Sequence, residues 1–138
     1  MMRTICCMFI GTLCTAPALA QVSPDQQRQA IFYSHYLQQC NLMYQIGLTA
    51  KSLLSSGKNP KDVSAYLIEK YAYGPNGEIL RGSSTAESQI SDIVAVVDAD
   101  MQKGGSSSPS TNFVSQQFLL ECQRDAQRLA EHDAQANP

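Results

Sequence analysis

The longest helical signal in the chain is SPDQQRQAIFYSHYLQQCNLMYQIGLTAKSLLSSG, residues 23–57. Ser23 is a favourable N-cap, Pro24 suits the first helical position, and Gln26 completes a capping box with Ser23. Gly57 can adopt the left-handed conformation that ends helices. Between these ends, inner residues recur at three- and four-residue steps, which predicts one long amphipathic helix. The predicted inner stripe consists of Tyr33, Leu37, Cys40, Tyr44, Gly47 and Leu54.

Three shorter runs carry the same kind of signal. A second helix is expected to begin at residues 59–62 and to end at the Gly-Pro-Asn-Gly turn of residues 74–77. A third begins at a capping box, residues 84–87; its many β-branched residues leave a strand as the alternative, but their spacing and the cap favour a helix. A last helix is expected from about Asn112 to Ala134. The predicted inner residues are Val63, Tyr66, Leu67 and Tyr71 in the second helix, Ile90, Ile93, Val94, Val97 and Met101 in the third, and Val114, Phe118, Cys122, Ala126 and Leu129 in the last.

Residues 1–20 have the three parts of a cleavable secretory signal. Arg3 gives a positive start, Ile5–Cys14 is an apolar run, and Ala18–Ala20 has the small-x-small pattern that a signal peptidase cuts. The apolar run is shorter than the roughly 20 residues that span a bilayer. We therefore expect a protein of the periplasm or the secreted fraction, in which residues 21–138 form a single domain without a membrane span. An uncut N-terminal anchor and a lipidated cysteine within the signal are the alternatives.

Cleavage would leave two of the five cysteines, Cys40 and Cys122. In an exported protein such a pair most simply forms one disulfide, and two buried free thiols are the alternative. The cysteines are 82 positions apart, and the chain-entropy model gives a stabilisation of about 4–5 kcal/mol for a bond that closes such a loop. Gly47, two turns after Cys40, would let another helix approach closely. The sequence therefore predicts an all-α, four-helix domain with two long and two short helices, whose first and last long helices are joined by this disulfide.

Two segments between the predicted helices have the composition of loops. Residues 104–111 are rich in Gly and Ser, which predicts a flexible linker. Residues 74–84 predict an exposed loop that contains two large apolar residues, Ile79 and Leu80. These two side chains could insert into a protein partner or fold back over the core. The candidate partner-binding residues are Tyr73, Glu78, Ile79, Leu80 and Arg81.

Charge and motifs argue against catalysis and against nucleic acid as a ligand. The mature chain would carry 9 basic and 12 acidic side chains, without the clustered Lys and Arg that nucleic acid or an anionic membrane requires. His35 and His132 lack a second ligand at metal-binding spacing, and no Gly-x-Ser-x-Gly elbow or phosphate-binding glycine loop is present. Glu121 and Asp125 share a helix face, where neighbouring arginines explain them as surface ion pairs. We therefore predict no catalytic residue, no metal or other cofactor, and no enzymatic activity.

In its signal, its predicted helix count and its cysteine pair, the chain resembles the small periplasmic immunity proteins that neutralise type VI secreted cell-wall amidases. The resemblance covers the mature chain as architecture and includes no shared sequence motif. It implies a protein partner, namely a cell-wall hydrolase inhibited by a loop or helix end that enters its cleft, and it implies a homodimer as one oligomeric state. A periplasmic chaperone or stress protein and an envelope assembly factor are the alternatives from other functional classes.

Overall fold

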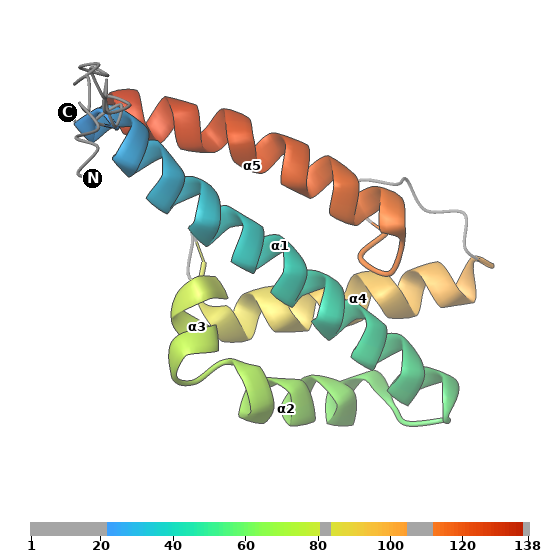
Figure 1. Ribbon diagram of the computed structural model, residues 1–138. Coiled ribbons are helices and arrows are strands. Elements are labelled where there is room, and N and C mark those ends of the chain that lie inside the picture. The colour runs from blue at the N-terminus through green and yellow to red at the C-terminus, as the bar shows by residue number, and fades with distance from the viewer. Residues whose placement is uncertain (1–21, 81–83, 105–111, 137–138) are drawn as a thin grey trace, which may run out of the picture.

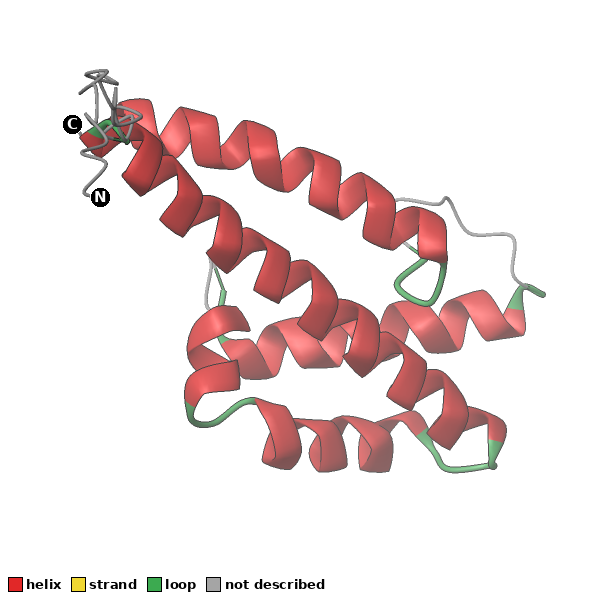
Figure 2. Cartoon of the chain, in the orientation of Figure 1, coloured by secondary structure: helices red, strands yellow, loops and turns green. Residues whose placement is uncertain are grey.

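The computed structural model describes residues 22–80, 84–104 and 112–136, and this part of the chain forms five α-helices without a strand (Figures 1 and 2). The helices are α1 (Pro24–Ser55), α2 (Pro60–Tyr71), α3 (Pro75–Leu80), α4 (Ala86–Gln102) and α5 (Gln116–Ala136). The prediction of an all-α fold is confirmed. The predicted count of four helices is not, because α3 lies inside the segment predicted as a loop. The predicted signal, residues 1–20, and nearly all of the predicted linker lie outside the described residues.

Side-chain caps determine where helices α1 and α4 begin. The Ser23 hydroxyl accepts a hydrogen bond from the Gln26 backbone N–H at 3.2 Å, and the Gln26 side-chain oxygen accepts one from the Ser23 N–H at 3.0 Å. This reciprocal pair is the predicted capping box, which satisfies two backbone donors that the helix leaves without partners. At α4 the cap is Thr85, not Ser84, and its hydroxyl accepts from the Ser88 N–H at 3.2 Å.

Helix α3 takes the place of the predicted loop over Pro75–Leu80. Gly74 has a φ of +70°, which reverses the chain after α2, and a proline at the next position suits a helix start. Gly77 packs on the backbone of Ala72, where a Cβ would lie 2.0 Å from the carbonyl oxygen. At the end of α3 the Leu80 side chain is completely buried. The prediction of an exposed loop is therefore wrong for residues 75–80, because this short helix carries a leucine into the core.

One apolar core joins the first four helices. Its largest buried side chains include Ile46 of α1, Leu67 of α2, Leu80 of α3 and Ile90 of α4. The core cluster consists of Leu42, Ile46, Ala50, Leu54, Val63, Leu67, Ala72, Leu80, Ala86, Ile90, Ile93, Val94 and Val97. The turn of residues 112–115 packs against this cluster through two partly buried side chains, but no residue of α5 belongs to it. The core of the domain is therefore built by α1–α4.

Helix α5 runs antiparallel to α1, so the start of α1 and the end of α5 lie together at one end of the molecule (Figure 1). It begins at Gln116, later than predicted, because residues 112–115 form a turn in which the Ser115 hydroxyl accepts from the Phe118 N–H at 3.0 Å. Leu129 was predicted on the inner stripe but is 48% exposed, since the inner face follows strict four-residue steps. The buried residues on this face are Phe118, Ala126, Ala130 and Ala134.

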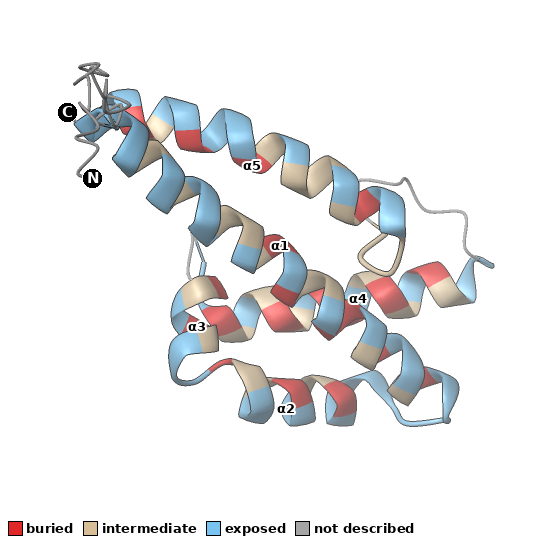
Figure 3. Cartoon of the chain, viewed as in Figure 1, coloured by how far each residue is buried: buried red, intermediate tan, exposed pale blue. Residues whose placement is uncertain are grey.

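Only the second half of α1 faces the shared core. Its buried residues begin at Cys40, whereas Ile31 is 68% exposed and Tyr33 is 37% exposed. The outer half of α1 extends beside α5 beyond the α2–α4 layer, so the prediction that Tyr33 belongs to the inner stripe is wrong (Figures 1 and 3). The predicted close approach at Gly47 is confirmed, although the neighbour is the turn before α5. A Cβ on Gly47 would lie 2.9 Å from both the Cβ and the carbonyl oxygen of Phe113.

Candidate partner-binding surface

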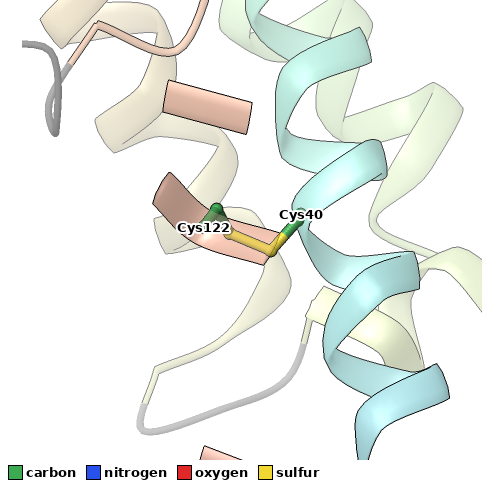
Figure 4. Close-up of a disulfide and its surroundings, with 2 residues drawn as sticks. All are labelled: Cys40 and Cys122. Carbon is green, nitrogen blue, oxygen red and sulfur yellow. A yellow bond between two sulfur atoms is a disulfide. The ribbon is translucent and has the colours of Figure 1, made fainter. Parts of the chain in front are cut away.

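Cys40 and Cys122 lie opposite each other on α1 and α5. Cys40 and Cys122 form a disulfide with their Cα atoms 5.8 Å apart, as predicted (Figure 4). Cys40 is 3% exposed, whereas Cys122 is half-buried. The bond therefore joins the first and the last long helix, as the sequence predicts.

The predicted partner-binding residues divide into accessible and inaccessible ones. Tyr73 is 64% exposed and Glu78 is exposed on α3, so both side chains can contact a partner. Ile79 is half-buried against the core cluster, and Leu80 is fully buried within it. Leu80 therefore cannot contact a partner in this fold, and the prediction that it does so is wrong. Arg81 lies outside the described residues.

Two residues of α2 that were not predicted as binding residues are exposed a few positions before Tyr73. Tyr66 was predicted on the inner stripe but is 46% exposed, and Lys70 is exposed as well. Tyr66 and Lys70 are four residues apart, so they project from one side of α2. Tyr73 lies two residues beyond the end of the helix, in the turn that leads to α3. We call these three residues the α2 face. The four-residue step from Val63 to Leu67 defines the buried side of α2 and could have shown that Tyr66 points away from it.

The lysine of the α2 face lies among tyrosine rings. Its Nζ atom is 5.9 Å from the ring centroid of Tyr66 and 5.1 Å from that of Tyr71, within the range of a cation–π contact. Hydrogen bonding to the Tyr71 side chain and charge interactions with both tyrosines raise the pKa of Lys70 above its ordinary value. The α2 face therefore presents a permanent cation flanked by exposed aromatic surface, which is the kind of surface found at protein interfaces.

A polar contact joins α1 and α5 toward the outer end of their pair. The Tyr36 hydroxyl donates a hydrogen bond to the Asp133 carboxylate, and the His132 Nδ1 atom lies 3.2 Å from the other carboxylate oxygen. The hydrogen bond from Tyr36, and secondarily the contact with His132, lower the pKa of Asp133. The same hydrogen bond raises the pKa of the Tyr36 hydroxyl. Because its donor is a half-buried tyrosine of α1 and its acceptor is a carboxylate of α5, we interpret this hydrogen bond as a structural link between the two helices.

Neither metal binding nor membrane insertion has structural support in the described part of the chain. Residues 22–80, 84–104 and 112–136 contain no group of three or more His, Cys, Asp or Glu side chains placed to hold a metal ion. Among the five helices, none combines the length and the apolar character needed to cross a bilayer. Comparison of the chain with models of protein families, with curated proteins and with solved structures finds no match.

Proposed function

We propose that this chain is an exported, non-enzymatic protein-binding domain that contacts its partner through the α2 face and the neighbouring Glu78 of α3. The observation that carries this proposal is the exposure of Tyr66 and Tyr73 on either side of Lys70. Large aromatic side chains are enriched among the residues that dominate binding energy at protein interfaces. A single exposed tyrosine is common on protein surfaces, but here Tyr66 lies in the second half of α2 and Tyr73 in the turn directly after it, seven residues apart in the chain.

Buried residues of α2 hold the backbone of the α2 face in place, which favours binding with little loss of conformational entropy. Val63 and Leu67 are completely buried on the opposite side of α2, and Ala72 is buried directly before Tyr73. The backbone under the aromatic rings is thereby held by the core before any partner arrives. Preorganisation of this kind leaves more of the contact energy available for affinity.

For the partner, we propose a cell-wall-degrading effector enzyme that the chain inhibits, in the manner of an immunity protein. The cleavable signal expected at residues 1–20 supports a location in the periplasm or the secreted fraction, where a disulfide persists and where such an enzyme acts. The acidic balance of the whole chain, a net charge of −2, disfavours nucleic acid as the partner. A homodimer with both α2 faces available is compatible with this role.

The proposal is tested by capture and inhibition. Tagged protein is incubated with envelope and secreted extracts, captured proteins are identified by mass spectrometry, and the main one is purified for a wall-hydrolysis assay. We expect one dominant hydrolase, inhibited at a stoichiometric ratio. The double variant Tyr66→Ala/Tyr73→Ala should bind it at least about 30-fold more weakly, since hot-spot residues contribute about 2 kcal/mol or more.

A matched control is the double variant Ile31→Ala/Tyr33→Ala, which removes comparably exposed apolar side chains from the outer half of α1, away from α2 (Figure 1). It should bind as the unmodified protein does. Equal loss in both variants would overturn the assignment of the α2 face. Capture of many unfolded clients, increasing at acidic pH, would replace the inhibitor by a chaperone, and recovery of an envelope complex would replace it by an assembly factor.

A further inference from the structure

Helices α1–α4 have a complete core of their own. All thirteen members of the buried core cluster come from α1–α4 and the residue that directly follows α2, and none comes from α5. Among the other helices, α5 makes substantial contact with α1 alone. Figure 1 shows the same separation, with α5 lying along one side of α1 and α2–α4 on the other. Removal of α5 from α1 would therefore leave that core intact.

The contact between α5 and α1 is the most extensive between any two helices of the described residues, but it buries few large apolar side chains of α5. Three of the four buried side chains on α5 are alanines, which remove little apolar surface from water. The hydrogen bond from the Tyr36 hydroxyl to the Asp133 carboxylate also joins the two helices. In addition to these contacts, one covalent bond, Cys40–Cys122, joins the two helices. Because the buried side chains of α5 are mostly alanines, we expect the disulfide to contribute a large share of what holds α5 on α1.

We propose that the Cys40–Cys122 disulfide is a redox-controlled latch, whose reduction releases α5 and uncovers the face of α1 beneath it. A thiolate of a dithiol reductant attacks the more accessible sulfur, that of Cys122; the S–S bond breaks, and the Cys40 sulfur leaves as a thiolate and takes up a proton. The second thiol of the reductant then attacks the mixed disulfide, which frees the Cys122 thiol and forms the disulfide of the reductant. Two electrons and two protons pass to the protein.

The uncovered face of α1 differs from the α2 face, so this inference goes beyond the proposed function. It contains Tyr36, Cys40, Tyr44 and Gly47, which recur at three- and four-residue steps along the helix. In the oxidised protein this strip lies against α5 and the turn before it. In the reduced protein it becomes a continuous surface of aromatic and small residues. The latch thus couples the oxidation state of two cysteines to the exposure of one helix face.

The burial of Cys40 supplies a direct test. In the variant Cys122→Ser the disulfide cannot form, and Cys40 remains shielded only if α5 stays docked. Iodoacetamide labelling of Cys40 is followed by peptide mass spectrometry in the presence of a phosphine reductant. We expect a labelling rate within about 10-fold of the rate in the urea-unfolded chain, because a released α5 no longer covers the thiol. The matched variant Cys40→Ser reports the reactivity of the half-exposed Cys122 thiol and should label rapidly in any case.

Hydrogen exchange distinguishes release of α5 from general unfolding. Exchange is measured by mass spectrometry on the full protein before and after reduction with dithiothreitol. Peptides from α5 should lose their protection, while peptides from α2 and α4 should keep it. Slow labelling of Cys40 together with a protected α5 would overturn the latch, because α5 would then stay docked without the bond. Simultaneous loss of protection in all helices would overturn it as well, because α1–α4 would then depend on α5.

Discussion

At the scale of single residues, the contact between Tyr36 and Asp133 links two positions 97 residues apart in sequence. The carboxylate accepts from the tyrosine hydroxyl and lies beside His132, so its ionised form is favoured in the folded state. The tyrosine in turn is favoured in its protonated form, which can donate the bond. The contact therefore requires a protonated Tyr36 and an ionised Asp133 at the same time.

This requirement predicts how the stability contributed by Tyr36 depends on pH. The lowered folded-state pKa of Asp133 stabilises the protein above the unfolded value of about 4, and this gain is lost as pH falls through the folded value. The raised pKa of Tyr36 gives stability below about pH 10 that is lost as pH rises through its folded value. We expect Tyr36→Phe to unfold at lower urea than the unmodified protein at neutral pH. The difference should shrink below about pH 4 and well above pH 10.

Tyr33→Phe is the matched control, because Tyr33 lies on the same outer half of α1 and is more exposed. Its urea midpoint should follow that of the unmodified protein across the whole pH range. A constant difference between Tyr36→Phe and the unmodified protein from pH 3 to pH 11 would contradict the assignment of the contact to these two ionisable groups.

At the scale of elements, the sequence predicted those helices that have both a cap and a long periodic stripe. Helices α1, α2 and α4 have these signals, and their starts lie within one residue of the predicted ones. Helix α3 escaped prediction because its six residues include Pro75 and Gly77, which have the composition of a turn. Its helical state depends on the burial of Leu80 among residues distant in sequence. A tertiary contact of this kind leaves no recognisable pattern in the local amino-acid sequence.

The candidate site could be predicted in part for the same reason. Tyr73 was recognised because it adjoins the Gly74 turn, where exposure follows from local sequence. Tyr66 was assigned to the core because three-residue and four-residue steps are both compatible with a helix face. The structure selects the four-residue series Val63, Leu67 and Tyr71, so Tyr66 is left on the outside. The four-residue step from Val63 to Leu67 was the signal in α2 that could have separated Tyr66 from the core.

Helix α3 yields a prediction that separates packing from binding. Leu80→Ala should lower the free energy of unfolding by about 2–5 kcal/mol, the usual cost of truncating a fully buried leucine. Glu78→Ala, on the exposed side of the same helix, should change it by less than about 0.5 kcal/mol. Urea denaturation followed by circular dichroism measures both. If Leu80→Ala had the small effect and Glu78→Ala the large one, the placement of α3 on the core would be wrong.

At the scale of the whole molecule, the fold consists of two parts with different means of stabilisation. Helices α1–α4 depend on buried aliphatic side chains, whereas the described contacts of α5 with α1 include a disulfide, an alanine-rich face and the hydrogen bond from Tyr36 to Asp133. Loop closure alone gives the bond a value of about 4–5 kcal/mol in the chain-entropy model. That value is comparable to the entire stability of many domains of this size. That value applies to the whole fold, because the loop between Cys40 and Cys122 contains α2–α4. Since α5 contributes no residue to the core cluster, we expect loss of the bond to loosen α5 more than α1–α4.

Urea unfolding of Cys40→Ser/Cys122→Ser, followed by far-ultraviolet circular dichroism, tests this division. If α5 is released, the helical signal before urea is added should be lower in proportion to the 21 residues of α5. The dependence of unfolding free energy on urea should also be weaker, because less surface remains to be exposed when α1–α4 unfold. If α5 instead stayed docked, both quantities would match the oxidised protein and only the midpoint would fall, since the bond would then act on the unfolded chain alone.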